Sequence, residues 1–246
     1  MKPFKVLLLL GMIIGNSAIA QELKEISYSE GTQKLKGLVT KNAGQKLPAV
    51  VILPAWKGID QESKDAALAL EKEGYIALIA DIYGEGNAPS DNAAASKLSS
   101  TYKKDFKLYQ NRIQAALEAV KTQGATDVAV IGYCFGGSGA LETARAGFDV
   151  KGSVCIHGGL SKSPNRANSA INTKVLVLHP ADDASVSKSD YDGLIVELDE
   201  GKADWQIITY ANSKHTFTNP ESPDYNETMA KRAWNHTLMF LKEVLK

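Results

Sequence analysis

The chain has few cysteines and no excess of charge, and both scarcities restrict what it can do. Its 246 residues include two cysteines and 28 basic against 28 acidic side chains, so the formal net charge is zero. A neutral balance does not favour binding to nucleic acid, which requires basic surfaces. Two cysteines without a Cys-x-x-Cys motif also make thiol redox chemistry the weaker hypothesis.

No apolar run is long enough to span a bilayer, including the one near the N-terminus. Lys2 and Lys5 precede an apolar run at residues 6–14 and a tract of mostly small residues at 17–20. This order is typical of a secretory signal peptide, and the run is shorter than the ~20 residues that span a bilayer. We therefore expect residues 1–20 to be a signal peptide and the mature protein to be periplasmic or secreted, without a stable membrane span.

The rest of the chain alternates between short apolar runs and helix-compatible segments. Residues 23–28 and 34–40 predict an antiparallel hairpin at one edge of a sheet. Continuous apolar runs, which are typical of parallel strands covered on both faces, lie at residues 49–53, 74–81, 128–131, 150–156 and 175–178. We predict that residues 21–246 form one α/β domain, with a mostly parallel sheet of about eight strands and helices on both faces.

The spacing of apolar residues predicts helices between these strands. Side chains at intervals of three and four mark one apolar face over residues 106–120, which we expect to cover the sheet. Asp60 is a candidate N-cap for an earlier helix, and residues 138–146 predict a later one. Residues 84–100 are rich in Gly, Asn, Pro, Ser and Ala, and we expect either a solvated loop or a mobile lid with short helices there.

The clearest functional pattern is the Gly-Tyr-Cys-Phe-Gly-Gly motif at residues 132–137, directly after an apolar run. Glycines two positions before and two after a nucleophile allow a strand and a helix to approach closely, as in the nucleophile elbow of α/β-hydrolases. We interpret Cys134 as the candidate nucleophile; the alternative is a buried cysteine beside an ordinary glycine turn. Cys155 lies within an apolar run, so we expect a core side chain rather than a disulfide partner.

A nucleophile needs a base within hydrogen-bonding reach and a third group that orients the base. Asp183 and His215 each follow a predicted strand, in the hydrolase order of nucleophile, acid and histidine. Parallel strands end at one edge of a sheet, so Cys134, Asp183 and His215 can converge there. Asp182 remains an alternative acid. We expect structural roles for the other three histidines, His157, His179 and His236.

Backbone amides can supply the oxyanion hole that acyl transfer requires. The first donor expected is the N–H of Phe135, which follows the nucleophile. The second should come from the loop after the strand at residues 49–53, and we select Trp56, with Ala55 as the alternative.

Several tracts resemble the dienelactone hydrolase family, over nearly all of the chain after the leader. They are residues 51–58, 74–84 and 132–137, the His-Gly-Gly at 157–159, the Asp183 turn and His215. The resemblance implies a Cys134–His215–Asp183 triad that attacks a small ester or lactone, an acyl-thioester intermediate, and no metal or organic cofactor. The resemblance also implies the α/β-hydrolase fold for residues 21–246 and the activity of a carboxylic-ester or lactone hydrolase.

Two departures from the family pattern bear on substrate and activation. Ala55 stands where the family commonly has a glutamate that contacts the resting thiol, so we expect His215 and the dipole of the following helix to activate Cys134. Residues 84–100 contain no arginine to bind a substrate carboxylate, so dienelactone itself is not the expected substrate. A second hypothesis is a degenerate member of the fold that binds ligands without catalysis.

Overall fold

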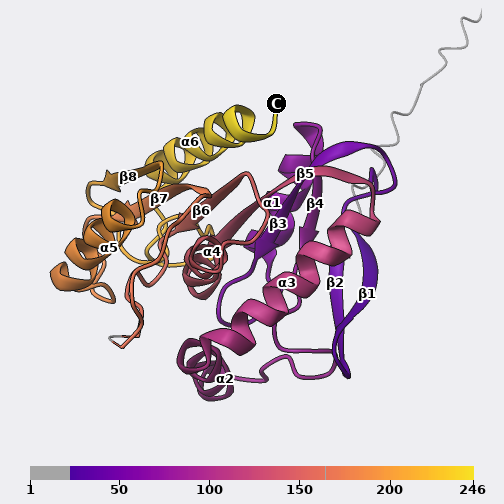
Figure 1. Ribbon diagram of the computed structural model, residues 1–246, viewed down its shortest axis with the longest axis horizontal. Helices are drawn as coiled ribbons and strands as arrows, with labels where there is room; N and C mark the ends of the chain where they lie inside the picture. The colour runs from indigo at the N-terminus through magenta and orange to yellow at the C-terminus, as the bar shows by residue number, and fades with distance from the viewer. Residues whose placement is uncertain (1–22, 164) are drawn as a thin grey trace, which may run out of the picture.

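The computed structural model describes residues 23–163 and 165–246, which form an eight-stranded sheet flanked by helices (Figure 1). The strands run in the order β1-β2-β4-β3-β5-β6-β7-β8 across the sheet. The hairpin of β1 and β2 pairs antiparallel with β4, and all later pairs are parallel. This confirms the predicted α/β-hydrolase architecture. The expected signal peptide at residues 1–20 lies outside the described residues.

The strands are β1 (Lys24–Glu30), β2 (Gln33–Val39), β3 (Leu47–Leu53), β4 (Ile76–Ile79), β5 (Ala125–Tyr133), β6 (Gly152–Ile156), β7 (Lys174–Pro180) and β8 (Trp205–Tyr210). The helices are α1 (Gln61–Lys72), α2 (Asn92–Lys104), α3 (Phe106–Thr122), α4 (Phe135–Arg145), α5 (Lys188–Glu200) and α6 (Glu227–Leu245).

Each face of the sheet packs against its own set of helices. On one face, Val51 and Leu53 of β3 lie in the cluster formed with α3 and the start of α4. On the other face, Val50 and Ile52 of the same strand pack with α1 and α6. Successive side chains of a strand point to opposite faces. Both sets are therefore buried, which explains why β3 is a continuous apolar run rather than an alternating one.

The segment at residues 84–100 has more regular structure than the solvated loop or the lid with short helices that the sequence led us to expect. Its second half is helix α2, which continues to Lys104 and is capped by the Asp91 side chain accepting from the Ala94 amide. Its buried face consists of Ala95, Ser99 and Tyr102. Two of these three side chains are small, so the face carried too weak an apolar signal to be recognised. The helix after the elbow also begins earlier than expected, at Phe135.

The junction between β5 and α4 leaves no space for side chains at its glycines, and the approach is closest at Gly132 and Gly136. A Cβ placed on Gly132 would overlap the carbonyl oxygen of Gly136, and one on Gly136 would overlap that of Leu53. Both obstacles are backbone atoms, which cannot rotate away. The glycines of the motif are therefore required by the approach of strand, helix and β3.

We predict that Gly132→Ala destabilises the fold by at least about 2 kcal/mol, because the added methyl group must displace backbone. Urea denaturation measures the change. Gly193→Ala is the matched control, because Gly193 lies exposed in α5 and a methyl group added there would meet no other atom within 4 Å. Alanine there should be neutral or stabilising by up to about 1 kcal/mol. Equal stability of the two variants would contradict the packing argument.

Candidate active site

Cys134 occupies a strained turn at the carboxyl end of β5. Its backbone has φ 52° and ψ −111°, in a region that non-glycine residues rarely adopt. Its N–H donates both to the carbonyl of Ile156 and to Nδ1 of His157, each at 3.1 Å. The half-buried thiol stands at the N-terminus of α4, where the helix dipole favours negative charge.

The loops after β7 and β8 bring an acid and a base to this thiol. Nε2 of His215 lies 3.1 Å from Sγ of Cys134, and its Nδ1 lies 2.8 Å from Oδ2 of Asp183. Asp183 is buried, whereas Asp182 is exposed. The backbone amide of Asp182 donates to the carbonyl of Ser213, and its side chain has no hydrogen-bond partner in the part of the chain that the structure describes. Of the two candidate acids, the structure thus brings Asp183 to the histidine.

The electrostatics of the three groups favour an ion pair. Burial alone lowers the pKa of His215, but its hydrogen bonds and the charges of Asp183 and Cys134 raise that pKa to about 10. Burial alone raises the pKa of Asp183, and hydrogen bonds from His215 and Ser185 lower it to about 2. At neutral pH the imidazole therefore carries a proton between a carboxylate and the thiol sulfur.

Ser185 is a site residue that sequence reasoning missed. Its hydroxyl donates to Oδ1 of Asp183 at 2.6 Å, its amide donates to the same oxygen at 2.9 Å, and the hydroxyl lies 3.0 Å from Nδ1 of His215. These contacts leave Oδ2 of Asp183 for the histidine. Ser185 follows the acid by two residues, a spacing typical of an Asx turn, but that pattern does not reveal a role at the base.

The two amides expected to form the oxyanion hole are free of protein acceptors within the described residues. Phe135 is the first residue of α4, where amides have no partner inside the helix. The loop that carries Trp56 is held in place because the carbonyl of Trp56 accepts from the hydroxyl of Tyr83 at 2.7 Å. The Phe135 carbonyl accepts from Tyr109, whose ring stacks on that of Phe135. Both peptide segments are therefore anchored while their N–H groups stay available.

A second hydrogen-bonded chain leads from the elbow to the other face of the sheet. Nδ1 of His157 accepts from the Cys134 amide, so the ring proton is on Nε2, which donates to Thr218 at 2.8 Å. The Thr218 hydroxyl in turn donates to Oε1 of Glu62 at 2.6 Å. Burial and the charge of His215 lower the pKa of His157 to about 3, which keeps this ring neutral.

The remaining histidines and the second cysteine fill structural positions, with one exception. His236 bonds through Nδ1 to the hydroxyl of Tyr210 at 2.7 Å, as a structural histidine should. His179 is buried, but its Nδ1 has no partner among the described residues, so no hydrogen bond at that atom supports the expected structural role. Cys155 and Cys134 are both free thiols, and burial raises the pKa of Cys155 to about 12.

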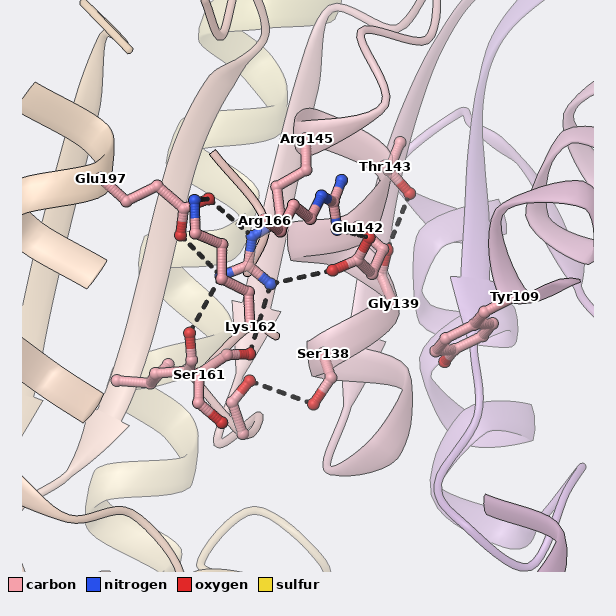
Figure 2. Close-up of polar contacts among 12 residues, drawn as sticks. Tyr109, Ser138, Gly139, Glu142, Thr143, Arg145, Ser161, Lys162, Arg166 and Glu197 are labelled. Atoms are coloured by element: carbon pink, nitrogen blue, oxygen red, sulfur yellow. Dashed lines mark hydrogen bonds and ion pairs between the residues drawn. The ribbon is translucent and has the colours of Figure 1, made fainter. Parts of the chain in front are cut away.

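A buried network of ion pairs fixes the segment that follows His157 against α4 (Figure 2). Arg145 donates to carboxylates of Glu142 and Glu197, and also to the carbonyl of Leu160. Arg166 donates to the second oxygen of Glu142 at 2.6 Å. Nearer the elbow, the Ser138 hydroxyl donates to the carbonyl of Gly159. Because each charge is paired, this network is structural.

The described residues hold no cluster of three or more His, Cys, Asp or Glu side chains that could bind a metal ion. Within the same part of the chain, none of the helices has the length and apolar character needed to cross a membrane.

An eight-stranded α/β sheet with a cysteine elbow, a histidine and an aspartate at one edge defines an α/β-hydrolase. The sequence model of the dienelactone hydrolase family matches residues 35–245. The chain thus belongs to the dienelactone hydrolase family, and it is an enzyme of the lactone-hydrolase type, as the resemblance implied.

Two curated relatives agree with this assignment over most of their length. A Bradyrhizobium protein named as a probable 2-oxo-3-(5-oxofuran-2-ylidene)propanoate lactonase is 26% identical, with 93% of this chain and 96% of the relative covered. A Saccharolobus solfataricus protein named for carboxymethylenebutenolidase activity is 25% identical, with 91% and 99% covered.

Solved structures also share the fold. A dienelactone hydrolase-like promiscuous phosphotriesterase from metagenomic libraries has a TM-score of 0.84 at 31% identity, covering 92% of this chain and 99% of its own. A Klebsiella pneumoniae structure described as a dienelactone hydrolase has a TM-score of 0.79 at 24% identity, covering 91% and 99%, and supports the fold alone.

We predict that Glu62→Gln changes how stability depends on pH. Burial, reinforced by the charge of Asp60, raises the pKa of Glu62 to about 7. A folded-state pKa above the ordinary value of 4.5 means that this group favours folding at low pH, and that the benefit is lost as pH rises through 7.

The glutamine variant has no such proton and can still accept from Thr218. Its stability relative to the natural protein should therefore rise between pH 4.5 and pH 8, by on the order of 2 kcal/mol. Urea denaturation of both proteins at the two pH values measures this difference. Parallel pH profiles of the two proteins would show that Glu62 is not perturbed in the folded state.

Proposed function

We propose that the protein hydrolyses a small ester or lactone, with Cys134 as nucleophile and His215 as general base and acid. Asp183 orients His215 and stabilises its positive charge. The observation that carries the proposal is the continuous contact from sulfur to imidazole to carboxylate, at 3.1 Å and 2.8 Å. Membership of a family of lactone hydrolases supports the same reaction class.

In the first half-reaction, the thiolate of Cys134 attacks the substrate carbonyl carbon and the C–S bond forms. The carbonyl electron pair moves to oxygen, and the resulting oxyanion is bound by the amides of Phe135 and Trp56. The tetrahedral intermediate then expels the alkoxide, which takes the proton from Nε2 of His215. The product is an acyl-thioester; if the substrate is a lactone, the alcohol stays attached to the acyl group.

In the second half-reaction, water replaces the alcohol. Neutral His215 removes a proton from the water as it attacks the thioester carbonyl, and the collapse of the second tetrahedral intermediate expels the thiolate of Cys134. The carboxylic acid leaves, and the imidazolium–thiolate pair is restored. Asp183 keeps the tautomer and orientation of His215 fixed through both steps.

Activation in this proposal does not use a carboxylate at position 55, where the chain has Ala55. The positive charge of His215 is the counter-ion of the sulfur, and this agrees with the raised pKa of His215, to about 10. The N-terminal dipole of α4 acts in the same direction.

We predict that Cys134→Ala lowers kcat/KM for p-nitrophenyl acetate by at least about 10³-fold, because the acyl-thioester cannot form. Release of p-nitrophenol measures the rate. Cys155→Ala is the matched control, since Cys155 is a buried core thiol away from the triad contacts; it should lose stability but keep most of the activity.

Undiminished turnover by the folded Cys134→Ala protein would overturn the assignment of the nucleophile. If the natural protein folds and binds esters but hydrolyses none of a panel of esters and lactones, the alternative of a ligand-binding member without catalysis is the correct one.

We also propose that the protein is exported, on the basis of the charged, apolar and small-residue order of residues 1–20. Expression of the full chain in a bacterium should yield a periplasmic or secreted product whose first residue, by mass spectrometry, is Gln21. Ala20→Arg should block processing, because the residue before the cleavage site must be small. A cytoplasmic product that retains residues 1–20 in both cases would refute export.

A further inference from the structure

A cavity of about 430 Å³ lies between α1 and α6, on the face of the sheet opposite α3 and α4. Its walls include Ala66 of α1 and Ala233 and Trp234 of α6. Its floor includes Tyr133 and Ile156, the residues just before Cys134 and His157. The volume is within the range of sites for small organic molecules, and the walls are mainly apolar.

Glu62 is a buried acid in this cavity that the proposed hydrolysis does not use. Its side chain lines the cavity, and the residue is 9% exposed. Oε1 accepts from Thr218, whereas Oε2 has no hydrogen-bond partner among the described residues. Among the described residues this oxygen is not one of the fully buried atoms that lack a partner, so it is accessible from the cavity and can accept a hydrogen bond from a ligand.

The hydrogen-bonded chain from the elbow fixes the role of Glu62 as an acceptor. Nε2–H of His157 donates to Thr218, so the single hydroxyl proton of Thr218 is directed to Oε1 of Glu62. His157 cannot reverse this direction, because its Nδ1 accepts from the Cys134 amide. Glu62 therefore accepts the hydrogen bond from Thr218 without being protonated itself, and its second oxygen can accept from the donor group of a ligand.

The charges around the cavity select the sign of the ligand. Two acids line it, Glu62 and Asp65, against one base, Lys231. That lysine already pairs with Glu227 at 2.6 Å. A cation is thus the complementary partner, whereas an anion would meet two carboxylates.

We propose that this cavity, the Glu62 cavity, is a second binding site that takes a small apolar or aromatic molecule bearing a protonated amine, whose ammonium group donates to Glu62. The apolar part would lie against Trp234 and the alanine walls. The site is separate from the thiol of Cys134, and the proposal does not depend on the hydrolytic function.

Calorimetric titration of the full chain with benzylamine at pH 8 tests the proposal, with benzyl alcohol and benzoate as neutral and anionic probes of similar shape. At this pH Glu62, whose pKa is raised to about 7, is mostly ionised, and the amine is still protonated. We expect benzylamine to bind at least about tenfold more tightly than benzyl alcohol, and benzoate more weakly than both. Glu62→Gln should abolish this preference for the amine. Asp65→Asn is the matched control, since Asp65 lines the same cavity from α1 but is exposed, and it should retain the preference.

Two further variants locate the site. Ala69→Phe fills the cavity from α1 without changing Glu62 and should weaken benzylamine binding, whereas Cys134→Ala should leave it unchanged. The proposal is overturned if the preference for the amine survives in folded Glu62→Gln, if Asp65→Asn loses it equally, or if Ala69→Phe binds as the natural protein does. Failure of benzylamine to bind at about 10 mM would overturn it as well. Loss of ester hydrolysis in Cys134→Ala has no bearing on these outcomes.

Discussion

The close approach of β5, α4 and β3 is the constraint on which the site depends. Because Gly132 and Gly136 have no Cβ, the chain can turn from strand to helix within one residue, and Cys134 takes the left-handed backbone conformation that this turn requires. Two acceptors for the Cys134 amide, the Ile156 carbonyl and Nδ1 of His157, help to hold that conformation. The sulfur thus stands at the sheet edge that Asp183 and His215 also reach.

Two histidines in different charge states, neutral His157 and protonated His215, meet at this edge, with ring centroids 5.4 Å apart. Burial and the neighbouring charge of His215 lower the pKa of His157, whereas Asp183 and Cys134 raise the pKa of His215. A proton on Nδ1 of His157 would confront the Cys134 amide, so the neutral ring is required by geometry as well as by burial. The proton therefore resides on His215, the only one of the two within reach of the thiol. Such a separation of pKa values marks the roles of acid–base pairs.

The sequence predicted those features that depend on local pattern. Strands such as β3 and β6 were recognisable because both of their faces are buried, and Asp183 and His215 were recognisable because they follow strands in a known order. Helix α2 was not recognised, because Ala95 and Ser99 form most of its buried face. The chain through Thr218 to Glu62 was not found either. It joins three distant segments by short polar contacts, which leave no periodic signal.

Glu62 is an acid near the elbow, but its position shows why it does not replace the glutamate for which this chain has Ala55. A carboxylate activates a thiol through its charge, and that effect requires proximity in a poorly screened environment. Glu62 reaches Cys134 only through two neutral side chains, Thr218 and His157, and its last contact is with the backbone amide rather than with sulfur. Such a chain transmits orientation but little charge. In the proposed hydrolysis, the electrostatic part of activation consequently falls on His215, whose own pKa is raised by Asp183 and by the thiol.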